Sequence, residues 1–382
     1  MISTTDVIDE GRAVRIRWRD GTEARFHAFW LYDNSPAPAI RDPGNGQRLI
    51  TIDQVPLALR VTQAEAADNG VTVVFAGDAE PVHFDGAWLH RHIYDHAKPL
   101  TQTTLPEHTE PWDGELSHQL GVHRFDEITT DAQAKRAWLT DIRRWGVTRL
   151  SGMPVRPGAV AEVARLFGYV RETNYGPVFQ VRAEVSPTNL AYTNAGLQAH
   201  TDNPYRDPVP TLQLLACLEN SVDGGMSVVV DGFKAALVLA DEAPDDFRLL
   251  RDHAARYEYA GQAGVRLTAR RPMIEVGPDG MLGQIRFNSR SVAALTDIPY
   301  ARMEAYYGAY RHFSEIIDRP QMQVAFRLAP GELFIVDNRR VLHARSTFGG
   351  AGNRLLEGCY ADVDGLYSTL SALEAETGEQ AA

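Results

Sequence analysis

Cysteines and long apolar runs are scarce in this sequence of 382 residues, and their scarcity excludes several classes of protein. Cys217 and Cys359 are the two cysteines, and each lies in a strand-like run, which favours reduced core thiols and excludes a cysteine-rich zinc site. No window approaches the roughly 18 unbroken apolar residues of a membrane span. The first residues also lack a basic region followed by an apolar run. We therefore expect no membrane association and a cytoplasmic location.

Basic residues are in deficit as well. Lysine and arginine total 38 against 50 aspartate and glutamate residues, which gives a formal net charge of −12. Because a surface of this sign repels a phosphate backbone, nucleic acid is not an expected partner. The expected partner is a small-molecule substrate. With 44% apolar residues the chain can fill a core. The sequence leaves open whether the chain is a monomer or a homodimer.

The first part of the chain has the pattern of a small β-rich N-terminal domain, expected over residues 1–97. Turn signals separate its short alternating runs, which are 14–18, 24–26 and 71–75. Residues 98–115 are rich in threonine and proline and are predicted to form a linker or a docking segment. The remaining residues, 116–382, are predicted to form a larger catalytic domain.

Short apolar runs typical of strands dominate the larger domain. They occupy 211–218, 226–230, 273–276, 284–287, 324–328 and 333–336. Helical spacing precedes these runs at 131–145 and 160–168, and interrupts them at 232–241 and 300–317. Many short strands with turn punctuation favour a barrel or jelly roll over alternating strand and helix units. The expected fold class is mainly β with helices.

His200, Asp202 and His343 are candidate metal ligands. In an extended segment the H-x-D pair at 200 and 202 points to one side, and His343 lies far downstream, just past an apolar run. Two histidines and one carboxylate leave adjacent metal positions open, which suits iron(II) that binds a chelating co-substrate and dioxygen together. An H-x-D triplet alone is weak evidence, because most such triplets are surface or capping residues. The same ligands also suit zinc in a hydrolase.

Arg354 favours the iron(II) interpretation of these ligands over the zinc interpretation. A guanidinium placed after the last metal ligand can hold a carboxylate through two parallel hydrogen bonds, as the distal end of 2-oxoglutarate requires. Considered alone, Arg354 would be interpreted as an ordinary surface arginine. Together with the three candidate ligands it argues for 2-oxoglutarate chemistry and against a zinc hydrolase.

These motifs resemble one known family. The sequence H-T-D, the segment D-N-R-R-V-L-H-A-R and the later R-L-L-E-G-C-Y-A-D are similar to the gamma-butyrobetaine dioxygenase branch of the taurine-dioxygenase-like superfamily. Further similar segments, which extend the resemblance to nearly the whole chain, are 30–34, 88–92, 174–181, 189–193, 224–227 and 230–233.

The resemblance implies a fold, a reaction and several site residues. The implied fold is a double-stranded β-helix, or jelly roll, preceded by the small β-rich domain. The implied cofactors are iron(II), held by the three candidate ligands, and 2-oxoglutarate, held by Arg354 and Ser227, with ascorbate as reductant. Oxidative decarboxylation of 2-oxoglutarate to succinate and carbon dioxide would then accompany hydroxylation of the substrate.

The chain departs from that family at one place. Relatives often hold zinc in the N-terminal domain with three cysteines and a histidine. This chain has Ser35, Ala37 and Ile40 at the cysteine positions, and of the four ligands only the histidine, His92, remains. We therefore expect no structural zinc, although the sequence leaves open whether His92 keeps a metal role.

The resemblance also implies a substrate that carries a trimethylammonium group. Such a group has no N–H to donate, so aromatic faces hold it best, through cation–π attraction worth roughly 0.5 to 2 kcal/mol. The candidates for this aromatic cage are Tyr175, Phe179, Tyr192 and Tyr360. Without the metal motif these four residues would be read as core aromatics.

The opposite end of the substrate is expected to be anionic. Its candidate partners are Asn189, Asn203, Asn288 and Arg290. In an extended run Asn288 and Arg290 share a face. One fixed cation with several neutral donors suits a phosphonate, with three acceptor oxygens and up to two charges, better than a carboxylate.

The leading sequence prediction is therefore hydroxylation of 2-(trimethylamino)ethylphosphonate to its 1-hydroxy product. Hydroxylation of gamma-butyrobetaine to carnitine is the alternative, because Arg290 can instead form a structural ion pair with one of the many acidic residues. A sensor that binds quaternary ammonium compounds without turnover is a third interpretation, which the intact metal ligands disfavour.

Overall fold

The computed structural model describes residues 1–44, 46–56, 58–67, 69–77, 80–95, 103–181, 196–349 and 352–376. The chain divides into two compact units, residues 1–99 and residues 100–381, which are described separately. Among the described residues, no helix is long and apolar enough to cross a membrane.

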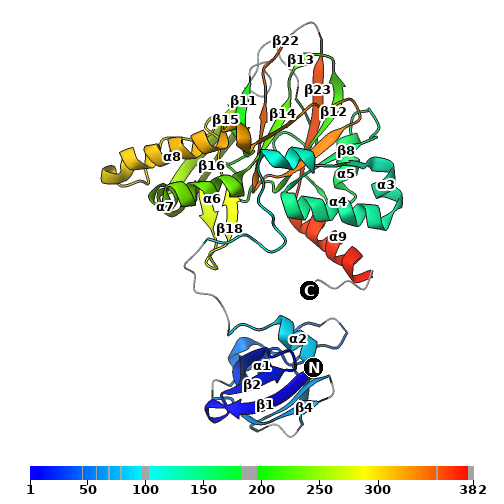
Figure 1. The fold of residues 1–382 in the computed structure, drawn as a ribbon, viewed down its shortest axis with the longest axis vertical. Coiled ribbons are helices and arrows are strands. Elements are labelled where there is room, and N and C mark those ends of the chain that lie inside the picture. The colour runs from blue at the N-terminus through cyan, green and yellow to red at the C-terminus, as the bar shows by residue number, and fades with distance from the viewer. Residues whose placement is uncertain are drawn as a thin grey trace. The chain divides into compact units, whose positions relative to one another are not determined.

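Two three-stranded antiparallel sheets form the described part of the smaller unit (Figure 1). Their strands are β1 (Ile2–Ile8), β2 (Ala13–Trp18) and β3 (Glu23–His27), and β4 (Val61–Ala67), β5 (Gly70–Phe75) and β6 (Val82–Asp85). Strands β3 and β6 lead into α1 (Ala28–Asp33) and α2 (Gly86–Arg91). Alternate residues of β2 and β5 are buried in one core, as period-two patterning requires. The predicted β-rich N-terminal domain is confirmed.

Packing and hydrogen bonds involve the positions that the resemblance associates with zinc. Ile40 is buried, and the hydroxyl of Ser35 accepts a hydrogen bond of 3.2 Å from the N–H of Ala37. The ring of His92 stacks on Trp88 with centroids 4.3 Å apart, and its Nδ1 lies 2.7 Å from the carbonyl oxygen of Trp88. The lack of zinc itself stays a prediction.

Two sheets form the centre of the larger unit. One has the strand order β10-β23-β12-β20-β8-β7, with β9 beside β23, and the other has the order β11-β21-β14-β19. The first sheet consists of β7 (Val122–Arg124), β8 (Val147–Ser151), β9 (Val170–Arg171), β10 (Phe179–Val181), β12 (Leu212–Asn220), β20 (Leu333–Asp337) and β23 (Arg354–Ala361). The second consists of β11 (Leu197–His200), β14 (Ser227–Asp231), β19 (Gln323–Phe326) and β21 (Val341–Arg345). The predicted double-stranded β-helix is confirmed.

Strand β12 shows why its residues from Leu212 to Leu218 are almost all apolar. Leu215 and Cys217 pack with Val229 of the second sheet, whereas Leu214 and Ala216 pack with the helices on the other face. A strand covered on both faces needs apolar residues at nearly every position. Gln213 is therefore an exception within this run.

Helices cover the two sides of the sheets (Figure 1). One group, which packs against the first sheet, contains α3 (Phe125–Thr130), α4 (Ala132–Trp145), α5 (Ala159–Ala164) and α9 (Val363–Glu376). The other contains α6 (Gly232–Glu242), α7 (Pro244–Asp252) and α8 (Met303–Ile317). Asp131 caps the start of α4 and Gly146, at φ 70°, ends it, as the apolar periodicity predicts.

Shorter strand pairs complete the larger unit. They are the hairpin β15 (Ala254–Gln262) and β16 (Val265–Pro272), the pair β17 (Ile274–Val276) and β18 (Leu282–Ile285), and the pair β13 (Asp223–Gly224) and β22 (Phe348–Gly349). The β15–β16 hairpin was not predicted.

The described part of the expected linker packs on the larger unit. Trp112 is buried, and its Nε1 donates to the carbonyl of Trp145 at 2.7 Å. Its backbone N–H donates to the carboxylate of Asp231 at 3.0 Å. The guanidinium of Arg340 donates to the same carboxylate at 2.8 and 3.0 Å, and to the carbonyl of Glu110 at 2.5 Å. This buried ion pair ties the segment to the turn that precedes β21.

Candidate active site

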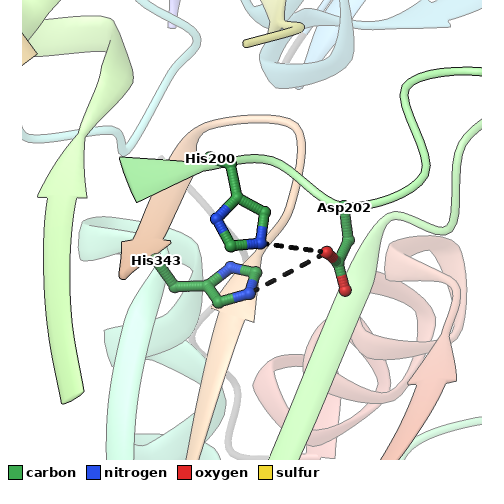
Figure 2. Close-up of side chains that lie close together, drawn as sticks. All are labelled: His200, Asp202 and His343. Carbon is green, nitrogen blue, oxygen red and sulfur yellow. Dashed lines mark ion pairs between the residues drawn. The ribbon is translucent and has the colours of Figure 1, made fainter. Parts of the chain in front are cut away.

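His200, Asp202 and His343 meet where β11 pairs with β21 (Figure 2). His200 ends β11 opposite His343 of β21, and their ring centroids are 4.4 Å apart. In the loop after β11, Oδ1 of Asp202 lies 3.4 Å from Nε2 of His200 and 3.9 Å from Nε2 of His343. Ligand atoms bound to one metal at about 2.1 Å and at right angles lie about 3 Å apart. The three side chains therefore converge as ligands of a single ion would.

The protonation of these side chains suits a divalent cation. Nδ1 of His200 lies 2.8 Å from the carbonyl oxygen of Gln198 and donates to it, which leaves the Nε2 lone pair directed inward. Burial, aided by the neighbouring His200, lowers the pKa of His343 to about 3 and keeps its imidazole neutral. Burial alone would raise the pKa of Asp202, but the two histidines and the Tyr360 hydroxyl outweigh it, so that pKa lies well below its usual value. Two imidazoles and one carboxylate are the donor set of many non-haem iron(II) sites.

Hydrogen bonds fix the orientation of Asp202. Its Oδ2 accepts from Nε2 of Gln213 at 2.5 Å and from the hydroxyl of Tyr360 at 2.7 Å. Its backbone N–H donates to Oδ1 of Asn338 at 2.6 Å, and Nδ2 of Asn338 donates to its carbonyl at 2.9 Å. The carboxylate therefore turns only Oδ1 toward the histidines. Sequence interpretation gave Gln213 and Asn338 no role, although a glutamine inside an apolar strand was an available signal.

A cavity of about 410 Å³ opens beside these ligands, a size within the usual range of small-molecule sites. Most of the predicted site residues line it, namely His200, Asp202, His343, Arg354, Ser227, Tyr175, Phe179, Tyr360, Asn203, Asn288 and Arg290. Two further predicted residues, Asn189 and Tyr192, lie outside the described residues.

Arginines make one side of this cavity electropositive. Arg290, Arg345 and Arg354 all line it, and the last two are buried. Arg345 lies in β21 opposite Ser227 of β14. Burial, together with the charges of Arg354 and Arg290, lowers the pKa of Arg345 to about 10, so these cations are close enough to act on one another. Arg345 was not predicted, although it follows His343 by two residues and so shares its face of the strand.

Aromatic rings also line this cavity. Tyr205 and Tyr259 stack with centroids 5.1 Å apart, and Tyr175 meets Tyr259 edge to face at 5.8 Å. The hydroxyls of Tyr175 and Tyr205 are 3.0 Å apart, and Phe179 lies 5.1 Å from the ring of Tyr360. Burial raises the pKa of Tyr175 and of Tyr205 well above the usual value, which keeps both phenols neutral. Sequence interpretation missed Tyr205 and Tyr259, since neither lies in one of the short motifs from which the site residues were predicted.

The expected extended run over Asn288 and Arg290 is wrong. Oδ1 of Asn288 accepts from the backbone N–H of Arg290 at 3.2 Å, and its Nδ2 donates to the carbonyl of Thr201 at 3.1 Å. The side chain thus stabilises a turn, as asparagine often does. Both residues still line the cavity, but they do not share the face of a strand.

Comparisons with known proteins agree with this geometry. Residues 103–360 match the model of the family described as taurine catabolism dioxygenase TauD, TfdA family, and residues 6–90 match the gamma-butyrobetaine hydroxylase-like N-terminal family. The chain is 34% identical to gamma-butyrobetaine dioxygenase of Pseudomonas sp. strain AK-1 over 363 residues, 94% of each chain. It is 27% identical to the human protein of the same name over 379 residues, 97% of each chain. A solved structure of asparagine oxygenase aligns with a TM-score of 0.49 and 19% identity, covering 69% of this chain and 93% of that one.

Proposed function

Because the chain belongs to the TauD, TfdA family of dioxygenases, we propose that it hydroxylates a small trimethylammonium zwitterion with iron(II) and 2-oxoglutarate. The observation that carries this proposal is the meeting of the His-Asp-His group, buried arginines and aromatic rings at one cavity. In the overall reaction, one oxygen atom of dioxygen enters the C–H bond of the substrate. The other enters succinate, which forms as 2-oxoglutarate loses carbon dioxide.

We assign iron(II) to His200, Asp202 and His343, which would hold it as three protein ligands. Arg354 receives the distal carboxylate of 2-oxoglutarate through its two-pronged guanidinium, and the hydroxyl of Ser227 adds a donor. Bound iron and co-substrate supply the oxidising chemistry. The side chains supply orientation, and they exclude water from the buried part of the site.

Gamma-butyrobetaine is the substrate that the observations support best. Both relatives compared above carry its name, and the similarity of one of them covers 94% of each chain at 34% identity. The ring faces of Tyr175, Tyr205 and Tyr259 suit a trimethylammonium head. Donors that also line the cavity, among them Asn203 and Arg290, suit its carboxylate. Hydroxylation would give carnitine.

The phosphonate 2-(trimethylamino)ethylphosphonate, which sequence interpretation preferred, becomes the second candidate. The relatives do not confirm it. One observation still favours it: Arg290 places a fixed cation on the cavity wall, where its charge acts on Asp202. A doubly charged phosphonate would gain more from that cation than a carboxylate.

One assay separates these functions. The protein is supplied with iron(II), 2-oxoglutarate and ascorbate, which keeps iron reduced, and succinate and hydroxylated product are measured with each zwitterion. We expect succinate and carnitine with gamma-butyrobetaine. A clear preference for the phosphonate would reassign the substrate. Binding of either zwitterion without oxygen consumption would identify a sensor, and failure to form succinate with both, despite bound metal, would contradict the proposed chemistry.

A further inference from the structure

Tyr360 takes part in two features of the cavity. Its hydroxyl donates to Oδ2 of Asp202 at 2.7 Å. Its ring lines the cavity and lies 5.1 Å from the ring of Phe179, at an interplanar angle of 33°. One rigid side chain therefore contacts both a metal ligand and the space for the substrate.

The backbone of Tyr360 is held on both sides. In β23 it pairs with Gln213 of β12 and with Arg171 of β9. Such a residue has little freedom to move except by rotation of its side chain. A molecule that presses on the ring would therefore act mainly on the position of the hydroxyl.

Gln213 is the partner of Tyr360 in register and also donates to the same oxygen, at 2.5 Å. The two donors come from the first sheet, whereas His200 and His343, which face Oδ1, come from the second. An oxygen that already accepts two hydrogen bonds is a poor metal ligand, because binding the metal would cost those bonds. Asp202 is thus restricted to coordination through Oδ1.

We propose that Tyr360 is a positioning residue that couples occupation of the substrate cavity to the iron site. With Gln213 it holds Asp202 to one coordinating oxygen, which keeps the neighbouring metal positions open for 2-oxoglutarate and dioxygen. Contact of the substrate with the ring then adjusts the hydrogen bond to Asp202. The inference rests on the proposed function, since it requires iron and 2-oxoglutarate in the site.

The consequence is coupling between the decarboxylation of 2-oxoglutarate and the hydroxylation of the substrate. Without the hydroxyl, Oδ2 loses a donor and can compete for the metal, so that the site no longer distinguishes an occupied cavity from an empty one. Tyr360→Phe should therefore consume 2-oxoglutarate without matching hydroxylation. Because the ring remains, the KM for the substrate should change by less than about threefold.

The variants Tyr360→Phe and Gln213→Leu test this inference, with Tyr257→Phe as the matched control. Tyr257→Phe also removes a buried tyrosine hydroxyl, but that hydroxyl donates to the carbonyl of Arg286 at 2.8 Å and lies outside the cavity lining. The first measurement needs no turnover. Under anaerobic conditions, the iron–2-oxoglutarate charge-transfer absorption is recorded before and after gamma-butyrobetaine is added. The second is the ratio of succinate to hydroxylated product in air.

We expect the absorption to shift on addition of substrate in the unmutated protein and in Tyr257→Phe, and to shift much less in Tyr360→Phe. The succinate-to-product ratio should rise at least about threefold in Tyr360→Phe and by a smaller factor in Gln213→Leu. Should Tyr360→Phe fail to fold, Gln213→Leu decides by the same two measurements. Unmutated behaviour in the folded variants would overturn the inference. Failure of the unmutated protein to bind iron and 2-oxoglutarate would instead contradict the proposed function.

Discussion

The metal end and the aromatic end of the cavity are built in different ways. At the metal end, His200 and His343 are direct partners in neighbouring strands, and hydrogen bonds hold Asp202 between the sheets. Among the aromatic residues, Phe179 and Tyr360 lie in strands of the first sheet, whereas Tyr175 and Tyr205 lie outside the strands and Tyr259 comes from the hairpin. Strand register places the two histidines opposite each other, whereas segments that can vary independently help to decide which molecule is brought to them.

Among the substitutions that test this comparison, removal of a metal ligand should have the largest effect on activity. We expect His200→Ala, Asp202→Ala or His343→Ala to abolish succinate formation, by at least about a thousandfold, because each leaves only two protein ligands. Far-ultraviolet circular dichroism of the metal-free proteins checks that the fold is retained. Activity like that of the unmutated protein in any of the three would remove that residue from the iron site.

Loss of Arg354 should come next. In Arg354→Ala a buried carboxylate loses its two-pronged partner, at a cost of about 3 kcal/mol, so the KM for 2-oxoglutarate should rise about a hundredfold while the KM for the substrate changes little. Arg354→Lys keeps the charge but loses the planar fork. Its KM for 2-oxoglutarate should therefore lie between that of the unmutated protein and that of Arg354→Ala. Equal changes in both KM values would place Arg354 outside the co-substrate site.

Arg290→Ala probes the anionic end of the substrate. The ratio of kcat/KM for 2-(trimethylamino)ethylphosphonate to that for gamma-butyrobetaine should fall at least about tenfold, or about 1.4 kcal/mol, because the more highly charged anion depends more on a fixed cation. The measurement is a competition between the two substrates. An unchanged ratio would remove the reason for keeping the phosphonate as a candidate.

The smallest effect is expected at the aromatic end. Tyr259→Leu removes one of several rings, and Tyr259 is only partly buried, so kcat/KM should fall by about 2- to 5-fold, equivalent to about 0.5 to 1 kcal/mol, and equally for both substrates. The matched control is Tyr300→Leu, since Tyr300 is 98% exposed. A loss with one substrate and not the other would show that Tyr259 does not hold the shared trimethylammonium head.

Local patterns predicted much of the first sheet and the metal end. The apolar runs of β12 and β20 mark strands buried on both faces, and the period of α4 marks a helix with one buried side. The i, i+2 spacing of His200 and Asp202 directs both toward one side. These features depend on neighbouring residues in the sequence, so the sequence contains them directly.

Contacts between distant segments were harder to predict. In the β15–β16 hairpin the apolar residues alternate with arginines and glutamates over a partly exposed surface. The pattern of buried apolar and exposed polar positions that predicts a strand is therefore weak. The turn at Asn288 depends on the carbonyl of Thr201, which comes from another part of the chain. Likewise, the role of Gln213 depends on its register with Tyr360. Spacing alone does not encode such partners.

The ion pair between Arg340 and Asp231 has a practical consequence for any shortened version of the chain. Residues before 116 supply the Trp112 side chain, its N–H on Asp231 and the Glu110 carbonyl on Arg340. A chain begun at residue 116 would leave that buried carboxylate and guanidinium with fewer partners, three residues from the last metal ligand. Boundaries for expressing the catalytic part alone therefore belong before Thr104, which pairs with Met281 and is the first bridged residue in the described part of the segment.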